Sequence, residues 1–231
     1  MGIILIIIVF AIVSFAVQAR LKNKFKKYSQ MSLRSGLSGR EVAERMLADN
    51  GIYDVQVVSV PGHLSDHYNP ATKTVNLSEQ VYHGRSIAAA AVAAHECGHA
   101  VQHATAYSML QLRTALVPLQ AISGKVMNIL FLAMIFGGSL LYSTFPYQQI
   151  LLVIIAAYGV FTLFAFVTLP VEFDASKRAL AWIDSHGIVS SMEHEGAKDA
   201  LKWAAMTYVV AAIASLVTLL YYIMAFLGSR D

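Results

Sequence analysis

Long runs without a charged side chain alternate with two polar stretches along the chain. The first run opens the sequence, the second is much longer, and the third lies near the C-terminus. A helix of about 20 apolar residues crosses a bilayer core of about 30 Å, so the long second run can cross twice, with its turn at residues 143–149. The predicted segments are a membrane anchor at 1–19, a transmembrane hairpin at 126–171 with spans near 127–143 and 150–169, and a final transmembrane helix at 203–231.

The polar stretch 20–125 carries signals for two helices. Ser38 followed by Glu41 is a capping box, which predicts a helix that starts there and stops at Gly51. Ser86 precedes a long alanine-rich run and is a suitable N-cap, so a second helix is expected from Ser86 towards Tyr107.

Two shorter segments between these helices alternate apolar and polar residues, as strands do. Residues 53–57 predict a strand that ends before Pro61, and 63–70 is rich in turn-forming residues. Residues 73–78 predict an exposed strand. Within it, residues 74–77 are a candidate for pairing with the backbone of a peptide, although an ordinary sheet strand is an equally good interpretation.

Composition and charge extend this picture. The chain is 57% hydrophobic and 13% charged, against about 25% charged in soluble domains, which indicates a membrane protein. Basic residues follow the first run and lie between the second and third, whereas a secretory signal would carry them before its apolar core. The residues are Arg20, Lys22, Lys24, Lys26 and Lys27, then Lys177, Arg178, Lys198 and Lys202. The positive-inside rule therefore places 20–125 and 172–202 in the cytoplasm, most simply at a bacterial cytoplasmic membrane.

The alanine-rich helix contains the pattern His-Glu-x-x-His. His95 and His99 lie one helical turn apart and can both bind one zinc ion, while Glu96 lies beside them as a general base. This is the arrangement of zincin metallopeptidases. The competing interpretation is a polar helix face that carries two histidines and a carboxylate without a metal.

A catalytic zinc ion needs a third protein ligand. His103 is eight residues from His95, about 12 Å along a helix, so it is expected outside the ligand set. Glu172 is the better candidate, because it follows Pro170, which favours a helix start or kink at the membrane boundary. Asp174 competes for this role, but it can instead pair with Arg178 one turn further on.

Besides the N-terminal anchor, three segments carry a family resemblance: 66–70, 93–102 and 169–176. Together they resemble the YugP-type membrane-bound neutral zinc metallopeptidases, and more distantly the HtpX and CAAX prenyl protease group. Glu172 matches the glutamate of the Glu-x-x-x-Asp motif that supplies the third zinc ligand in that group. Ser176 stands where the group has aspartate, so hydrogen bonding around the ligands should differ here.

The predicted fold is a mainly α membrane protein with four transmembrane helices and a zincin-like cytoplasmic metallopeptidase domain (α+β) whose small sheet lies beside the metal helix. One catalytic Zn²⁺ bound by His95, His99 and Glu172 would activate water, with Glu96 as the base, to cleave a peptide or membrane protein. The alternative is a zinc-binding membrane scaffold or chaperone. No motif points to nucleic acid, and nothing indicates an oligomeric state. Candidates for stabilising the oxyanion are His186, His194, Tyr208, His67 and Tyr68.

Overall fold

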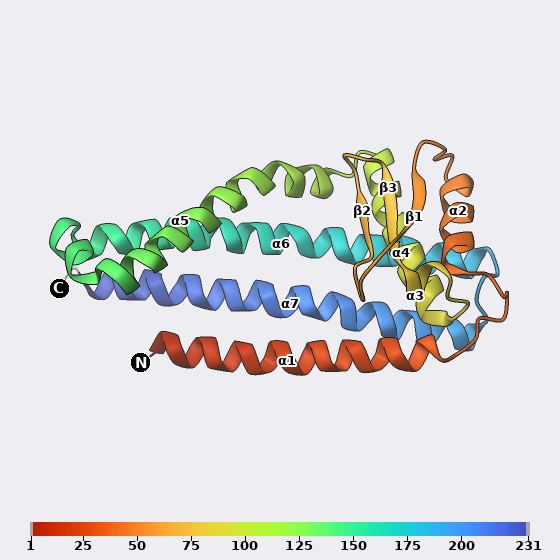
Figure 1. Cartoon of the computed structure of the whole chain (residues 1–231), viewed down its shortest axis with the longest axis horizontal. Coiled ribbons are helices and arrows are strands. Elements are labelled where there is room, and N and C mark those ends of the chain that lie inside the picture. The colour runs from red at the N-terminus through yellow and green to blue at the C-terminus, as the bar shows by residue number, and fades with distance from the viewer. Residues whose placement is uncertain (1, 230–231) are drawn as a thin grey trace. The chain divides into compact units, whose positions relative to one another are not determined.

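A computed structural model describes residues 2–229, apart from the side chains of 139–142. The protein is mainly helical with one small sheet, as predicted (Figure 1). In chain order the elements are α1 (Gly2–Ser29), α2 (Gly39–Asp49), β1 (Gln56–Val60), β2 (His67–Asn69), β3 (Thr74–Ser78), α3 (Glu79–Tyr82), α4 (Ile87–Ala104), α5 (Ser108–Thr144), α6 (Tyr147–Ser185) and α7 (Ser191–Gly228).

Within residues 2–229, four helices are long and apolar enough to cross a membrane, which confirms the predicted number. They are α1, the Ser108–Gly138 part of α5, α6 and α7. Many of their large apolar side chains face outward, such as Phe15 at 75% and Phe136 at 83% exposure. Such continuous apolar surface is typical of a protein whose surroundings are lipid.

The helix ends and interruptions differ in part from the predictions. α5 ends at Thr144 and α6 begins at Tyr147, so the hairpin turn lies within the predicted stretch, and α5 has a non-helical backbone at Gly137. The expectation that Pro170 starts a helix is wrong, because α6 continues through it. The loss of one backbone hydrogen bond at proline is outweighed by packing, since a buried stripe continues on the same helix face at Val171, Ala175 and Ala179.

Contacts divide the chain into two compact units. One consists of Met1–Phe15, Leu112–Leu169 and Tyr208–Asp231, and the other of Ala16–Gln111 and Pro170–Thr207. The second unit holds the sheet, α2, α3, α4 and the polar parts of α6 and α7, and it contains a well-packed buried core. The largest wholly buried side chains of that core include Val42, Met46, Val75, Leu77, Val81, Ile183 and Ile188.

The sheet has the order β1-β3-β2. β1 runs parallel to β3 with Gln56 opposite Thr74, and β2 runs antiparallel to β3 with His67 opposite Asn76. The first strand lies at Gln56–Val60, three residues beyond the predicted 53–57, and the predicted turn-rich segment 63–70 contains β2.

The expectation of an exposed strand at 73–78 is wrong. β3 is the central strand and is almost wholly buried, so it has no edge free for a peptide. Its alternating polar side chains are bonded internally instead of facing water. Asn76 Nδ2 donates to Thr74, and Ser78 Oγ donates to the carboxylate of Asp66.

Both predicted helix starts are confirmed. The Ser38 hydroxyl accepts from Glu41 N–H while the Glu41 carboxylate accepts from Ser38 N–H, which is a complete capping box for α2. Ser86 accepts from Ala89 N–H at the start of α4. α4 ends at Ala104, three residues short of Tyr107, so the whole His-Glu-x-x-His pattern lies in regular helix.

Candidate metal centre

The closely packed crossing of α4 and α6 positions the candidate site. α4 is rich in alanine and buried along nearly all of its length. At Gly98, between the two histidines of the pattern, a Cβ atom would lie 2.6 Å from the carbonyl oxygen of Ala175 on α6. A side chain at this position would therefore hold the two helices further apart than they are.

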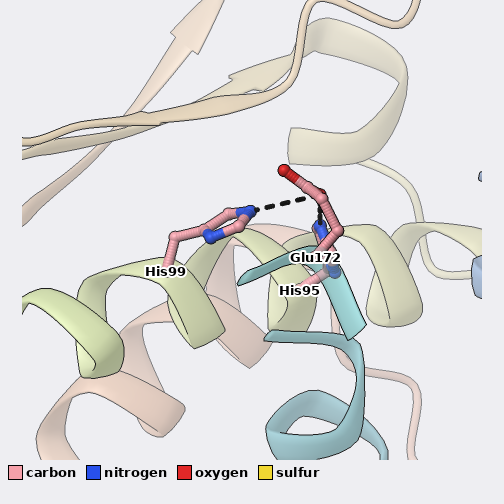
Figure 2. A group of neighbouring side chains, drawn as sticks. All are labelled: His95, His99 and Glu172. Carbon is pink, nitrogen blue, oxygen red and sulfur yellow. Dashed lines mark ion pairs between the residues drawn. The ribbon is translucent and has the colours of Figure 1, made fainter. Parts of the chain in front are cut away.

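Three side chains converge at this crossing (Figure 2). His95 and His99 project from α4, and Glu172 reaches them from α6. The Oε2 atom of Glu172 lies 3.3 Å from His95 Nε2 and 3.6 Å from His99 Nε2. One ligand atom from each residue lies within 4.8 Å of the other two. Among the described residues, this is the one group of three His, Cys, Asp or Glu side chains with such a spacing. Glu172 is buried, whereas the two imidazoles retain slight exposure.

The two separations between the Glu172 carboxylate and the imidazole nitrogens fit a tetrahedral zinc ion. With bonds of about 2.0–2.1 Å, two ligand atoms of a tetrahedral site lie about 3.3–3.4 Å apart. The two separations, 3.3 and 3.6 Å, agree with that spacing to within a few tenths of an ångström. Two imidazole nitrogens and one carboxylate oxygen are also the donor set of several catalytic zinc sites, which leave a fourth position for water.

Each imidazole has a hydrogen-bond partner at its other nitrogen. His95 Nδ1 lies 3.1 Å from Ser176 Oγ, and His99 Nδ1 lies 3.0 Å from Gln102 Oε1. Such contacts orient metal-binding histidines. Asp174, the competing third ligand, bonds instead to Arg178 at 2.6 Å, so it lies outside the group of three.

Charge at the site is concentrated on carboxylates. Burial opposes the charged form of His99, but the neighbouring Glu172 and Glu96 carboxylates outweigh it and raise the pKa of His99. A divalent cation bound here would replace the proton of the charged His99 imidazole as the positive partner of these carboxylates. The local electrostatics therefore favour a cation here.

Glu96 is buried next to the group of three without belonging to it. Its Oε2 atom accepts a hydrogen bond of 3.0 Å from the backbone N–H of Tyr68 on β2. That N–H lies on the edge of β2 that is not paired with β3. The contact holds the candidate base between the metal helix and the sheet edge.

The remaining residues singled out in the sequence lie in other environments. His103 bonds to the Tyr68 hydroxyl at 2.8 Å and is outside the group of three, as expected. Of the oxyanion candidates, Tyr68 thus lies beside the site through its backbone. The others have different partners or locations: His67 bonds to the Ser65 carbonyl, His186 pairs with Asp49, His194 faces Asp184, and Tyr208 belongs to the first compact unit.

Sequence reasoning missed two participants, Gln102 and the Tyr68 amide. Gln102 follows His99 by three residues on α4, so its position on the same helix face was a usable signal. The Tyr68 amide could not be found this way, because its role depends on β2 and a contact across 28 positions of the chain.

The donor group and the apolar helices define a candidate zinc centre in a membrane protein, and the comparisons agree with that class. The family described as "Putative neutral zinc metallopeptidase" matches residues 3–227, so the chain belongs to this family. It is also similar to the "Putative membrane protease YugP" of Bacillus subtilis (strain 168), with 44% identity over 218 residues, covering 94% of this chain and 93% of that protein. No solved structure matches it.

Proposed function

We propose that this membrane protein is a zinc-dependent peptidase that hydrolyses peptide bonds at the cytoplasmic face of the membrane. The observation that carries the proposal is the convergence of His95, His99 and Glu172, with one ligand atom of each within 4.8 Å of the others and Glu96 adjacent in sequence. Membership of the family and the similarity to a membrane protease support the same reaction class.

The three ligands differ in what they contribute. His95 and His99 are neutral donors when they bind a cation, and Glu172 supplies one negative charge from a buried position. When bound, zinc supplies Lewis-acid activation of a water molecule and of the scissile carbonyl. Because Glu172 supplies the single negative charge among these ligands, a bound divalent ion would keep a net positive charge, which would favour deprotonation of water and stabilisation of an oxyanion.

Glu96 is the proposed general base. It accepts a proton from water as the water oxygen forms a bond to the carbonyl carbon, and it returns the proton to the nitrogen as the C–N bond breaks. Two products result, a carboxylic acid and an amine. The Tyr68 N–H keeps the Glu96 carboxylate beside the sheet edge, so the base is held in place before substrate binds.

β2 is the strand that we propose aligns the substrate, in place of the central strand β3. It pairs with β3 along one edge, and its other edge faces the site through Tyr68 N–H. An extended peptide that adds to this edge would run alongside α4 and donate to β2 carbonyls, since Glu96 already accepts from Tyr68 N–H, and it would bring one of its own carbonyls to the zinc position. The substrates are then extended peptides or unfolded segments of membrane proteins.

We propose a cytoplasmic site because the basic residues near it lie in the two polar stretches. A cysteine replacing the exposed Glu195 can test this, since the native Cys97 is buried and gives little background. A membrane-impermeant maleimide should label Glu195→Cys in inverted vesicles and leave it unlabelled in intact cells. The opposite pattern would place the site outside.

The decisive experiment for the reaction combines zinc analysis with cleavage of a peptide library by the full-length protein. Glu96→Gln should keep zinc and lose turnover, and Glu172→Ala should lose zinc and turnover together. Glu195→Gln, which changes an exposed glutamate paired with Lys198, is the matched control and should behave as wild type. If Glu96→Gln cleaves as fast as wild type, the hydrolytic role of Glu96 is wrong. A scaffold that keeps zinc for structure predicts no cleavage by any variant.

A further inference from the structure

Gln102 is the fully buried polar side chain next to the candidate metal centre. Its exposure is 0%, and both ends of its amide have partners. The nitrogen Nε2 donates to the Val171 carbonyl at 2.8 Å and to Asp174 Oδ2 at 2.9 Å, and the oxygen Oε1 lies 3.0 Å from His99 Nδ1. One side chain of α4 thus contacts a candidate zinc ligand and two residues of α6.

The partners on α6 fix the orientation of this amide. A peptide carbonyl accepts hydrogen bonds and cannot donate, and the Asp174 carboxylate, which is paired with Arg178, also only accepts. The NH₂ group of Gln102 must therefore face α6, and its oxygen must face His99. An amide oxygen has no proton to give, so His99 Nδ1 is the donor.

The orientation of the amide in turn selects the tautomer of His99. With the proton on Nδ1, a neutral imidazole presents a free lone pair at Nε2, the atom that faces Glu172. The opposite tautomer would put a proton at the zinc position and set two acceptors, Nδ1 and Oε1, against each other. His95 has no comparable constraint, because the Ser176 hydroxyl beside its Nδ1 can either donate or accept.

We propose that Gln102 is a positioning residue that fixes His99 in its metal-binding tautomer and holds it in place against the helix that carries Glu172. The inference rests on the proposed zinc site. Val171 and Asp174 flank Glu172 closely in sequence, so the same amide also fixes the position of Glu172 relative to α4.

Two substitutions separate the acceptor role of Gln102 from its role in joining the helices. Gln102→Met keeps the length of the side chain and removes both hydrogen-bonding ends. Gln102→Glu keeps an acceptor for His99 and removes the Nε2 donor, and it places a carboxylate near Asp174. Ser176→Ala removes the partner of the other histidine and serves as the matched comparison. Full-length protein is used for zinc competition against a chelator, thermal unfolding of the zinc-free form, and imidazole ¹⁵N spectra.

Positioning of His99 predicts that Gln102→Met loses about 10–100-fold in zinc affinity. It also predicts mixed His99 tautomers in the zinc-free ¹⁵N spectrum of this variant, recorded at an alkaline pH at which the imidazole is neutral. Gln102→Glu should recover most of the affinity and the Nδ1–H tautomer although its melting temperature falls. Ser176→Ala should lose less affinity than Gln102→Met.

A different pattern would overturn the inference. If Gln102→Met and Gln102→Glu lose zinc affinity equally and in parallel with their melting temperatures, the amide serves helix packing alone. Unchanged His99 tautomers in Gln102→Met would overturn the inference as well. A His99→Ala variant that binds zinc like wild type would refute the metal site itself, a result that is distinct from either.

Discussion

Replacing Gly98 with alanine should separate helix stability from metal binding. The added Cβ would lie 2.6 Å from the Ala175 carbonyl oxygen, and 3.1 Å from its carbonyl carbon and Cα. Relief to an ordinary contact of about 3.4 Å requires α4 and α6 to separate by about 0.8 Å, because backbone atoms cannot rotate away. Metal sites tolerate deviations of about 0.2 Å in ligand distance, so Glu172 could no longer share an ion with both histidines without distortion.

Two opposing free-energy terms act on folding. Alanine favours helix over glycine by about 0.8–1.0 kcal/mol, whereas overpacking costs about 1–3 kcal/mol. The folded state of Gly98→Ala should therefore lose at most about 2 kcal/mol, and zinc affinity should fall by at least tenfold. Gly159→Ala on α6 is the matched control, because a Cβ there meets nothing within 4 Å. Chelator competition measures the zinc affinity, and thermal unfolding measures the stability of the folded state. Wild-type zinc affinity in Gly98→Ala would refute the close crossing.

Four further predictions concern the rest of the second unit. Burial raises the pKa of the Cys97 thiol, and its Sγ donates to the Ala43 carbonyl, so maleimide should label Cys97 only after denaturation; rapid labelling of folded protein would contradict this. Ser38→Ala should destabilise α2 by about 0.5–2 kcal/mol in hydrogen exchange. Hydrogen bonds from the Ser38 backbone and hydroxyl lower the pKa of Glu41. The stabilisation of α2 by this capping box is therefore complete above the ordinary pKa of 4.5 and disappears as pH falls through the lowered pKa of the folded protein. Hydrogen exchange in α2 that does not change on acidification would contradict this. Asp199→Ala removes the carboxylate that accepts hydrogen bonds from Lys24 and Tyr28. Because the Lys24 and Asp199 side chains are 26% and 28% exposed, the loss of stability in thermal unfolding should be only about 1 kcal/mol. A much larger loss would contradict this.

The sequence was sufficient where the signal is local. The capping box at Ser38 and the N-cap at Ser86 act within one helical turn, so both helix starts could be predicted. The choice between Glu172 and Asp174 was also local, because Arg178 lies one turn beyond Asp174 and forms the expected pair with it. Runs without charge predicted the four apolar helices for the same reason.

Predictions failed where distant partners decide the outcome. The alternation at 73–78 indicated a strand that faces water, but Ser78 is bonded to Asp66, and Asn76 donates to the backbone carbonyl of His67 on β2. Pro170 favoured a helix start, yet α6 continues through it and packs closely against α4 at Ala175. The part played by Gln102 depends on Val171 and Asp174, which lie 69 and 72 positions further along the chain.

X-ray absorption at the zinc edge of the purified, zinc-loaded protein tests the central claim most directly. The proposed centre predicts four nitrogen or oxygen neighbours at about 2.0–2.1 Å, with outer scattering from two imidazoles, and a changed spectrum and lower zinc content in Glu172→Ala. A sulfur neighbour at about 2.3 Å, scattering from fewer than two imidazoles, or an unchanged Glu172→Ala spectrum would contradict it.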